Sequence, residues 1–120
     1  ADGLQNAGLT VDLDVDTTAD LPVPVSAVLF RSAQEVLRNV VSHSGAHRVG
    51  VQAVADGETA VLVVDDDGRG FDQRDLEQRM SHGHFGLRAL GDLVAQAGGR
   101  LTVTSAPGAG TRAEVSVPLR

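Results

Sequence analysis

The chain has 120 residues, of which 42% are hydrophobic and 22% charged; its formal net charge is -6 and it contains no Cys. These values are typical of one compact globular domain, and they exclude a disulfide scaffold and a thiolate metal site. The negative charge and the low aromatic content, three Phe with no Tyr or Trp, argue against a nucleic-acid-binding protein.

The basic residues are all Arg, which excludes a P-loop because that motif needs a lysine. The longest uninterrupted aliphatic run, residues 60–64, is far shorter than the roughly 20 residues that span a bilayer. The N-terminus lacks the pattern of a signal peptide. We therefore expect a cytoplasmic segment without membrane contact, from a parent protein that can itself be membrane-anchored, and we expect residues 1–8 to be the remnant of a linker.

The first half of the chain predicts a strand, a long helix and a β-hairpin. Residues 9–15 alternate apolar and polar side chains, as a half-buried strand does. An apolar stripe at helical spacing then predicts a helix from Ser26, its N-cap, to about residue 44, with Gly45 as its stop. Residues 48–54 and 59–65 read as two strands joined by an Asp-Gly turn, which predicts an antiparallel pair.

The second half predicts a lid, a helix and a second hairpin. Residues 71–83 are polar and lack clean periodicity, so we expect a lid with one short helical turn near residues 73–80. A helix is predicted over residues 85–97, followed by strands at 100–106 and 111–119. One mixed, mostly antiparallel sheet with both helices on one face accounts for these elements, which is an α+β class.

The stretch "VVDDDGRGFD", residues 63–72, brings three carboxylates to the end of a strand. An EF-hand fails because its fifth and twelfth positions would be Arg69 and Leu76. A solvated turn is one reading. In the other, Asp66 is buried and accepts a hydrogen bond from the exocyclic amine of a purine, while Gly68 and Gly70 let the backbone approach that ligand. Asp65, one pleat away, would then face elsewhere.

Two polar residues of the first predicted helix, Glu35 and Asn39, are four apart and share one side. This pattern is common on solvated helix faces. It also has a chemical reading, because an Asn carbonyl oxygen can ligate Mg²⁺ and a nearby Glu can act as a base. A Lys-free acidic chain that binds a polyphosphate would need such a cation.

Glycines and histidines precede the second predicted helix. Gly83 and Gly86 can expose backbone N–H groups to an anion at the helix start, although a glycine pair is weak evidence. The "GAGT" stretch that ends at Thr111 reads as a hairpin turn, or as a turn whose Thr hydroxyl binds phosphate. His82 and His84 have a metal-compatible spacing, but they lack a convincing third ligand and read better as lid histidines.

Together these segments resemble the catalytic ATP-binding domain of bacterial sensor histidine kinases, in the GHKL ATPase superfamily. The resemblance covers nearly all of residues 10–119 and is strongest to kinases paired with helix-turn-helix response regulators. It lies in "FRSAQEVLRNVVSHSGA" as the N box, "VVDDDGRGF" and "GHFGLRAL" as the glycine boxes, and "PGAGTRAEVSVPL" as the closing strand pair. The implied fold is the two-layer α/β sandwich of that superfamily, with a short ATP lid.

The resemblance also implies roles for single residues. Asn39 would ligate Mg²⁺, Glu35 would be the polar catalytic residue, and Asp66 would recognise adenine. The other residues implied to contact the nucleotide are the glycines Gly68 and Gly70, the lid hinges Gly83 and Gly86, the hydroxyl of Thr111, and the box residues His43, Phe71, His84, Phe85 and Leu87. ATP and Mg²⁺ are the implied ligands.

As a function, the resemblance implies transfer of the ATP γ-phosphoryl group to a His, for relay to a response regulator. None of the four His of this chain precedes Asp or Glu, so the acceptor is expected on a separate dimerisation domain. The isolated chain would then be a monomer that binds ATP with little turnover. The alternatives are an anti-sigma-factor Ser/Thr kinase, an ATPase clamp, or a nucleotide-binding module that has lost catalysis.

Two residues depart from the family pattern. Ser42 stands where a Lys or Arg often precedes the N-box His, and Asp67 replaces a common Asn. Both changes are expected to make the pocket more negative, which predicts a pronounced dependence on Mg²⁺ unless Arg38, Arg69 or Arg88 compensates.

Overall fold

The computed structural model describes residues 9–17 and 21–119, apart from the side chains of residues 16, 17, 43, 44 and 85. The predicted linker remnant, residues 1–8, lies outside the described part of the chain. The elements in chain order are β1 (Thr10–Thr17), α2 (Val23–Asn39), the π-helical turn η1 (Val40–Ser44), β2 (Arg48–Ala55), β3 (Thr59–Asp66), α3 (Gln73–Ser81), the 3-10 turn η2 (His84–Gly86), α4 (Leu87–Gln96), β4 (Arg100–Ser105) and β5 (Thr111–Pro118).

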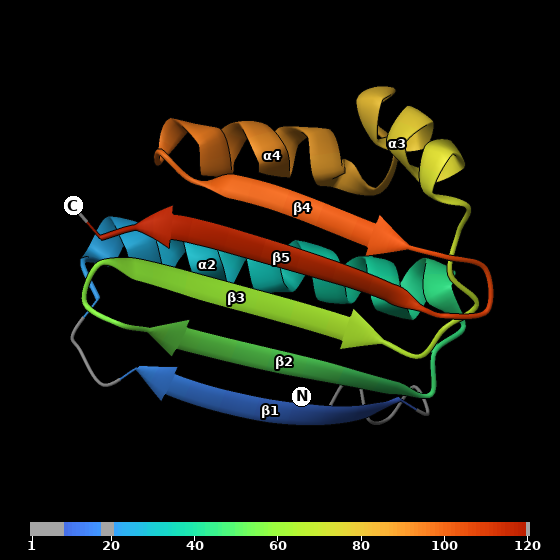
Figure 1. Ribbon diagram of the computed structural model, residues 1–120, viewed down its shortest axis with the longest axis horizontal. Coiled ribbons are helices and arrows are strands. Elements are labelled where there is room, and N and C mark those ends of the chain that lie inside the picture. Colours follow the sequence, from blue (N-terminus) through green and yellow to red (C-terminus); the bar gives the residue numbers. More distant parts are fainter. Residues whose placement is uncertain (1–8, 18–20, 120) are drawn as a thin grey trace.

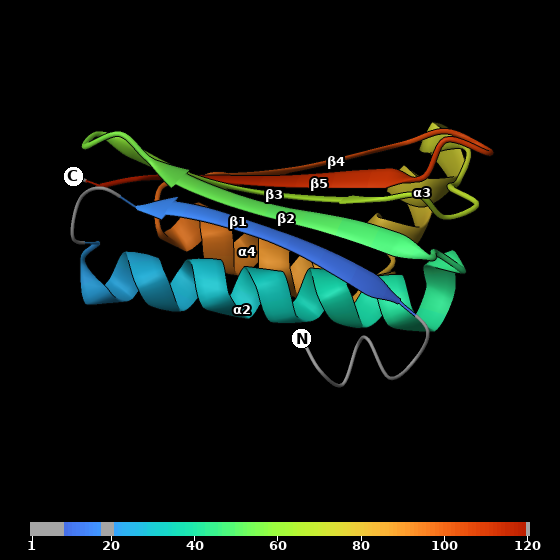
Figure 2. The same cartoon turned by 90° about the horizontal axis from the view of Figure 1, so that it is seen from below.

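The strands form one five-stranded sheet in the order β1-β2-β3-β5-β4 (Figure 1). β1 pairs with β2 in parallel, and the other neighbours are antiparallel. Seen from the side, α2 and α4 lie on the same face of this sheet (Figure 2). The predicted two-layer α+β architecture, with helices on one face of a mixed sheet, is therefore confirmed.

The core lies between the sheet and the two helices. Because side chains alternate along a strand, every second residue points to the helices. Buried side chains accordingly come from the inward positions of the strands and from one stripe of each helix, among them Val49, Val51, Leu62, Val64, Val115 and Val117 on the sheet and Val28, Val36, Leu90 and Val94 on the helices. The same alternation turns the last residue of β3, Asp66, toward the helices.

The long helix α2 begins earlier than predicted. Its N-cap is Pro22 rather than Ser26, and a second proline stands in its first turn. Proline is tolerated there because the first N–H groups of a helix have no intrahelical partner. The carbonyl of Pro22 accepts hydrogen bonds from the N–H groups of Val25 and Ser26, both at 3.0 Å. At the other end the helix continues into η1 and stops at Gly45, as predicted, with φ 66°.

The predicted lid contains a complete helix, α3, of nine residues instead of a single turn. Asp72 caps it, since its carboxylate accepts a hydrogen bond from the N–H of Asp75 at 3.2 Å. Leu76 is its only buried residue, so no apolar stripe marked this helix in the sequence. α3 lies at the end of the sheet where β3 and β4 terminate (Figure 1).

The outer strand β1 is only partly covered. Leu13 pairs with Val51, so it points to the helix side, yet it is 65% exposed, and Val15 on the same side is 55% exposed. The helices therefore cover the other strands and leave the β1 edge open.

Candidate functional site

The inward-facing ends of three strands bring polar side chains together. Asp66 ends β3 and pairs with Thr111 at the start of β5, and Thr111 in turn pairs with Ser105 at the end of β4. All three point toward the helix layer, where neighbouring positions carry apolar core residues. Three polar groups at the edge of an apolar core mark this end of the sheet as the candidate site.

Asp66 is half-buried, and its carboxylate accepts a hydrogen bond from the N–H of Gly68 at 2.8 Å. Burial raises the pKa of Asp66 above its ordinary value, and the charges of Asp67 and Asp65 act in the same direction. Backbone N–H groups of Gly68 and Thr111 oppose that rise. A carboxylate in this setting gains from a further hydrogen-bond donor that arrives with a ligand.

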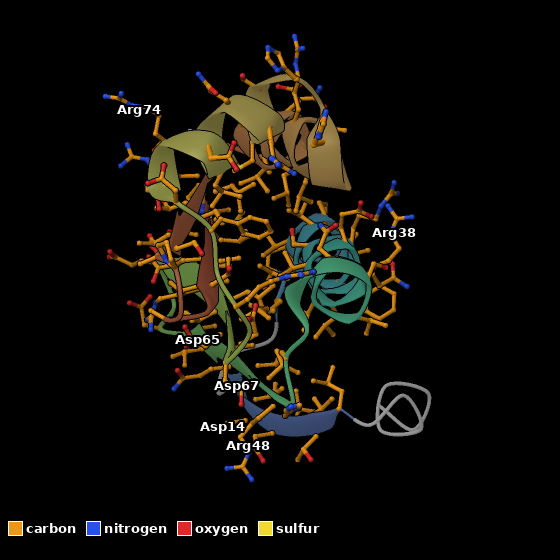
Figure 3. All side chains as sticks on the ribbon, turned by 90° about the vertical axis from the view of Figure 1, so that its right-hand side faces the viewer. Asp14, Arg38, Arg48, Asp65, Asp67 and Arg74 are labelled. Atoms are coloured by element: carbon orange, nitrogen blue, oxygen red, sulfur yellow. The ribbon has the colours of Figure 1, made fainter. Side chains whose placement is uncertain are left out.

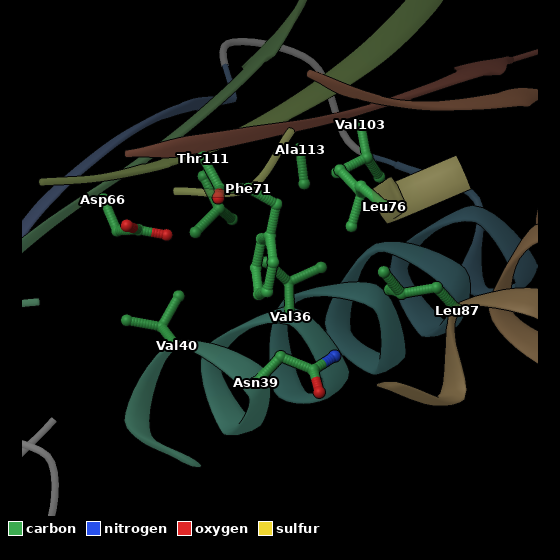
Figure 4. Close-up of a pocket in the computed structure, with 11 residues that line it drawn as sticks. Val36, Asn39, Val40, Asp66, Phe71, Leu76, Leu87, Val103, Thr111 and Ala113 are labelled. Carbon is green, nitrogen blue, oxygen red and sulfur yellow. The ribbon is translucent and has the colours of Figure 1, made fainter. Parts of the chain in front are cut away.

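A cavity of about 50 Å³ lies beside Asp66, between the sheet, α2, α3 and α4. Figure 4 shows Asp66 and Thr111 on the sheet side of this cavity and Asn39 on the α2 side. Its lining is otherwise apolar and consists of Val36, Val40, Val64, Phe71, Leu76, Leu87, Val103 and Ala113. An apolar slot with one carboxylate, one hydroxyl and one amide suits a flat heteroaromatic ring that carries an amine.

Asp67 lies outside this cavity. Its carboxylate accepts hydrogen bonds from the N–H groups of His47 and Arg48, at 2.9 and 3.0 Å, which hold the end of β3 to the start of β2. These hydrogen bonds lower the pKa of Asp67. Figure 3 places Asp67 near Arg48, far from Arg38 on α2. Asp67 therefore does not line the cavity, but its charge still raises the pKa of Asp66, so its effect on nucleotide affinity stays a prediction.

Asp65 faces the open side of the sheet, as expected from the alternation of side chains. There its carboxylate lies 3.3 Å from the guanidinium of Arg112. The three consecutive aspartates thus have three different surroundings, and only Asp66 lines the cavity.

Glu35 also lies outside the cavity lining. It forms an ion pair with Arg38 at 2.6 Å and lines a neighbouring groove of about 500 Å³ between α2 and α4, together with Gly86. Gly86 has φ 69°, and a Cβ on it would collide with the Glu35 carboxylate. The N-box glutamate therefore contacts the predicted lid hinge directly, while Asn39, one turn further along α2, lines the cavity.

Ser105 and Gln73 support the residues that line the cavity, and neither was predicted from the sequence. The buried Ser105 hydroxyl accepts a hydrogen bond from the N–H of Phe71 at 2.8 Å, donates to the carbonyl of Gly110 at 2.8 Å, and lies 2.9 Å from the Thr111 hydroxyl. The Gln73 amide binds the β4 edge, accepting from the N–H of Ser105 at 2.8 Å.

One signal could have revealed Ser105. In the strand sequence "RLTVTS" it occupies an inward position, after Leu101 and Val103, where the pattern asks for an apolar residue. A polar side chain at such a position needs a partner. Gln73 offered no comparable signal, because its role depends on α3 lying against β4.

The two glycine turns at the site fit into each other. Gly70 has φ 68°, and a Cβ on it would collide with the carbonyl of Ala106. Gly110 has φ 76°, and a Cβ there would collide with the carbonyl of Asp66. The lack of a side chain at Gly70 thus serves packing against the β4–β5 turn, whereas the sequence predicts that it lets the backbone approach the ligand.

The other predicted residues fall into three groups. Gly68 and Leu87 are buried, and Leu87 lines the cavity. Gly83 and His84 are exposed at the junction of α3 and η2, and Ser42 is exposed on η1. The side chains of His43 and Phe85 lie outside the described part of the structure.

Neither a protein-only metal site nor a membrane span is found in residues 9–17 and 21–119. No three His, Asp or Glu side chains in those ranges gather as metal ligands. No helix there is sufficiently long and apolar to cross a bilayer.

The family model described as histidine kinase-, DNA gyrase B- and HSP90-like ATPase matches residues 25–120. The chain is 36% identical over 119 residues to the histidine-protein kinase/phosphatase UhpB of Salmonella typhimurium, spanning 98% of this chain and 22% of that protein. It is 34% identical over 116 residues to the sensor histidine kinase NarS of Mycobacterium tuberculosis, spanning 97% of this chain and 27% of that protein.

Among solved structures, the histidine kinase domain of the blue-light activated kinase EL346 from Erythrobacter litoralis superposes with a TM-score of 0.75 at 30% identity. That similarity covers 97% of this chain and 55% of the kinase domain. The chain thus spans about a quarter of each curated relative and about half of the solved domain. With the family model matching residues 25–120, the chain belongs to the family of histidine kinase-, DNA gyrase B- and HSP90-like ATPases.

Proposed function

We propose that this chain is the ATP-binding catalytic domain of a sensor histidine kinase. It binds ATP and donates the γ-phosphoryl group to a His on a dimerisation domain outside this sequence, and a response regulator then receives the group. The bond from the γ-phosphorus to its bridging oxygen breaks, a phosphorus–nitrogen bond forms on the imidazole, and ADP leaves.

One observation carries this proposal. The carboxylate of Asp66 lies half-buried at the wall of an apolar cavity, with the Thr111 hydroxyl on the adjacent strand. An acceptor at that position suits the amine of adenine and disfavours guanine, which presents a carbonyl oxygen at the equivalent position. The names of the relatives, sensor histidine kinases among them, support the same reading.

The residues present fit a magnesium ion that arrives with the nucleotide. Mg²⁺ needs few protein ligands when phosphate oxygens supply the others, and an amide oxygen is one that it accepts. Asn39 offers such an oxygen on the α2 side of the cavity. When bound, the ion would neutralise charge on the phosphates during transfer. The need for Mg²⁺ is strong because the neutral Ser42 on η1 stands where the family often carries a cation close to the phosphates.

Glu35 is proposed to act at the phosphate end of the site, beside the lid hinge Gly86. Its ion pair with Arg38 brings a cation close to that end of α2, so Arg38 is the arginine best suited to replace the missing N-box cation. The domain is proposed to work in the cytoplasm as a monomer until the dimerisation domain of its parent presents the acceptor His.

The test joins this chain to the dimerisation domain of its parent protein. Incubation with Mg-ATP is expected to yield phosphate that is labile in acid and stable in base, as on histidine. The Asn39→Asp variant is expected to lose that labelling, whereas Phe30→Ala, on an exposed site of α2, is the control that should keep it. Phosphoserine in place of phosphohistidine would refute the proposed acceptor.

A further inference from the structure

The ring of Phe71 stands in the middle of the candidate adenine cavity. Figure 4 shows it reaching from the sheet side toward Val36 on α2, between Asp66 and Leu76. With the ring in this position the cavity measures about 50 Å³. Sites for small organic ligands span roughly 300–1,000 Å³, so a purine cannot enter beside the ring.

The backbone of Phe71 is held in place on both sides. Its N–H donates to the buried Ser105 hydroxyl at 2.8 Å, and the preceding Gly70 is packed against the β4–β5 turn. A shift of the whole segment would break these contacts, so the ring can leave the cavity only by rotating about its own side-chain bonds. Side-chain torsions occupy a few discrete staggered rotamers, so the ring moves between separate positions rather than sliding continuously.

The apolar wall explains why the ring rests inside. Val36, Leu76 and Val103 come from α2, α3 and β4, and each is buried. A phenyl ring among them removes apolar surface from water. Adenine would offer the same wall a flat surface of similar kind and add a hydrogen bond to Asp66.

We propose that Phe71 is a self-occupying gate of the adenine site: its ring competes with adenine for the same apolar slot and must rotate out before a nucleotide binds. The inference rests on the proposed function, since it takes adenine as the ligand. The fraction of molecules with the ring out limits the apparent affinity, which equals the intrinsic affinity multiplied by that fraction.

A gate and a ring that merely lines the pocket predict opposite changes in adenosine affinity when the ring is removed. If the ring only lined the pocket and stacked on adenine, its removal would weaken binding. If the ring must first leave, its removal strengthens binding and speeds association. Titration calorimetry with adenosine and with Mg-ATP on this chain, together with stopped-flow association, separates the two.

Phe71→Ala is expected to bind adenosine about three- to tenfold more tightly than the unaltered chain, with most of the gain in the association rate. Phe71→Leu, which keeps more of the apolar packing, is expected to have an adenosine affinity between those of Phe71→Ala and the unaltered chain. The matched control is Phe30→Ala, which removes a ring that is 67% exposed on α2 and should leave the affinity unchanged. Equal or weaker adenosine binding by folded Phe71→Ala would overturn the gate.

A second measurement keeps Phe71 in the chain, so the gate can be tested even if Phe71→Ala does not fold. The chain contains three Phe, so 4-fluorophenylalanine labelling gives three fluorine NMR signals, and Phe71→Leu identifies one of them. That signal is expected to move on saturation with adenosine, and a signal that stays in place contradicts the gate. Absence of binding by every folded form would overturn the proposed function too, whereas tight ATP binding with an unmoved ring overturns the gate alone.

Discussion

The carboxylate of Glu35 on α2 packs directly against the backbone of Gly86, where η2 passes into α4. The contact joins the middle of the longest helix to the junction that follows the predicted lid. Because Gly86 has φ 69°, both its backbone angle and its lack of a side chain are needed for this approach.

Gly86→Ala should therefore destabilise the chain more than the same change at Gly83. Both glycines have positive φ, at 69° and 83°, so alanine costs about 1–3 kcal/mol of unfolding free energy at either position. Only Gly86 faces the Glu35 carboxylate, and the space around Gly83 is open. The Glu35 carboxylate ends a flexible side chain that can rotate away, so urea unfolding should show only a small extra loss for Gly86→Ala, below about 1 kcal/mol, from the displaced Glu35–Arg38 ion pair.

Glu35→Ala provides the check on that interpretation. In the Glu35→Ala background the colliding carboxylate is absent, so the unfolding free energy lost through Gly86→Ala should approach that lost through Gly83→Ala. An unchanged difference between the two glycine variants would mean that Glu35 is not its cause.

Adenosine binding should weaken in mild acid earlier than the ordinary pKa of aspartate would suggest. Burial raises the folded-state pKa of Asp66, and an adenine amine needs the ionised carboxylate as acceptor. Affinity should thus be full above that raised pKa and fall as the pH drops through it. Calorimetry with adenosine measures this, since adenosine has no phosphates that titrate in the same range.

Asp66→Asn is the companion variant for this pH profile. It should bind adenosine about 10- to 100-fold more weakly at neutral pH, because a hydrogen bond to a charged acceptor is lost. Its profile should lack the acid step. Since ionised Asp66 is disfavoured by burial, the thermal stability of the variant at neutral pH should equal or exceed that of the unaltered chain. Unchanged adenosine affinity would remove Asp66 from the site.

Asp67→Asn should lower the melting temperature at neutral pH but not in strong acid. Hydrogen bonds from the N–H groups of Arg48 and His47 lower the pKa of Asp67 in the folded chain. The ionised carboxylate thus contributes stability above its unfolded pKa, and this contribution is lost as the pH falls through the lowered folded value. Asp14→Asn, which removes one charge from exposed β1, is the control for net charge. Equal melting temperatures of Asp67→Asn and Asp14→Asn at neutral pH would contradict a stabilising role for the hydrogen bonds from His47 and Arg48 to Asp67.

Ser105→Ala should cost about 1–3 kcal/mol of unfolding free energy, because it leaves the N–H of Phe71 and the carbonyl of Gly110 without their hydroxyl partner. Ser116→Ala, further along β5 on the open face of the sheet, should cost much less. Urea unfolding of the two variants gives the comparison. A loss at Ser105 no larger than that at Ser116 would show that its hydrogen bonds do not hold the three segments together.

The strands and their pairing could be predicted from local pattern, and the reasons are visible in particular residues. Asp56 and Gly57 set the β2–β3 hairpin, and the alternation around Leu62 and Val64 fixes which side faces the helices. The same alternation separates Asp65 from Asp66, so the sequence predicts which of the two carboxylates lines the cavity. These features depend on short-range geometry that the sequence carries itself.

Other features depend on contacts between distant segments and left no local sign. Gln73 begins a helix whose anchoring comes from β4, and that helix buries one side chain, so it read as a lid with a single turn. The carboxylate of Asp67 is held by the N–H groups of His47 and Arg48, where β2 begins, 20 and 19 positions away. The family pattern assigned Gly70 to the ligand and led us to expect a more negative pocket from Asp67, whereas the closest contacts of both residues are with backbone.

The open β1 edge has a consequence for how the chain behaves at high concentration. An outer strand with exposed Leu13 and Val15 could pair with the same strand of a second molecule and begin an aggregate. The exposed aspartates Asp12 and Asp14 alternate with them, so antiparallel pairing of two such edges would crowd like charges against one another. The acidic character of this strand therefore opposes edge-to-edge pairing of separate copies, a role that is independent of the candidate site on β3, β5 and β4.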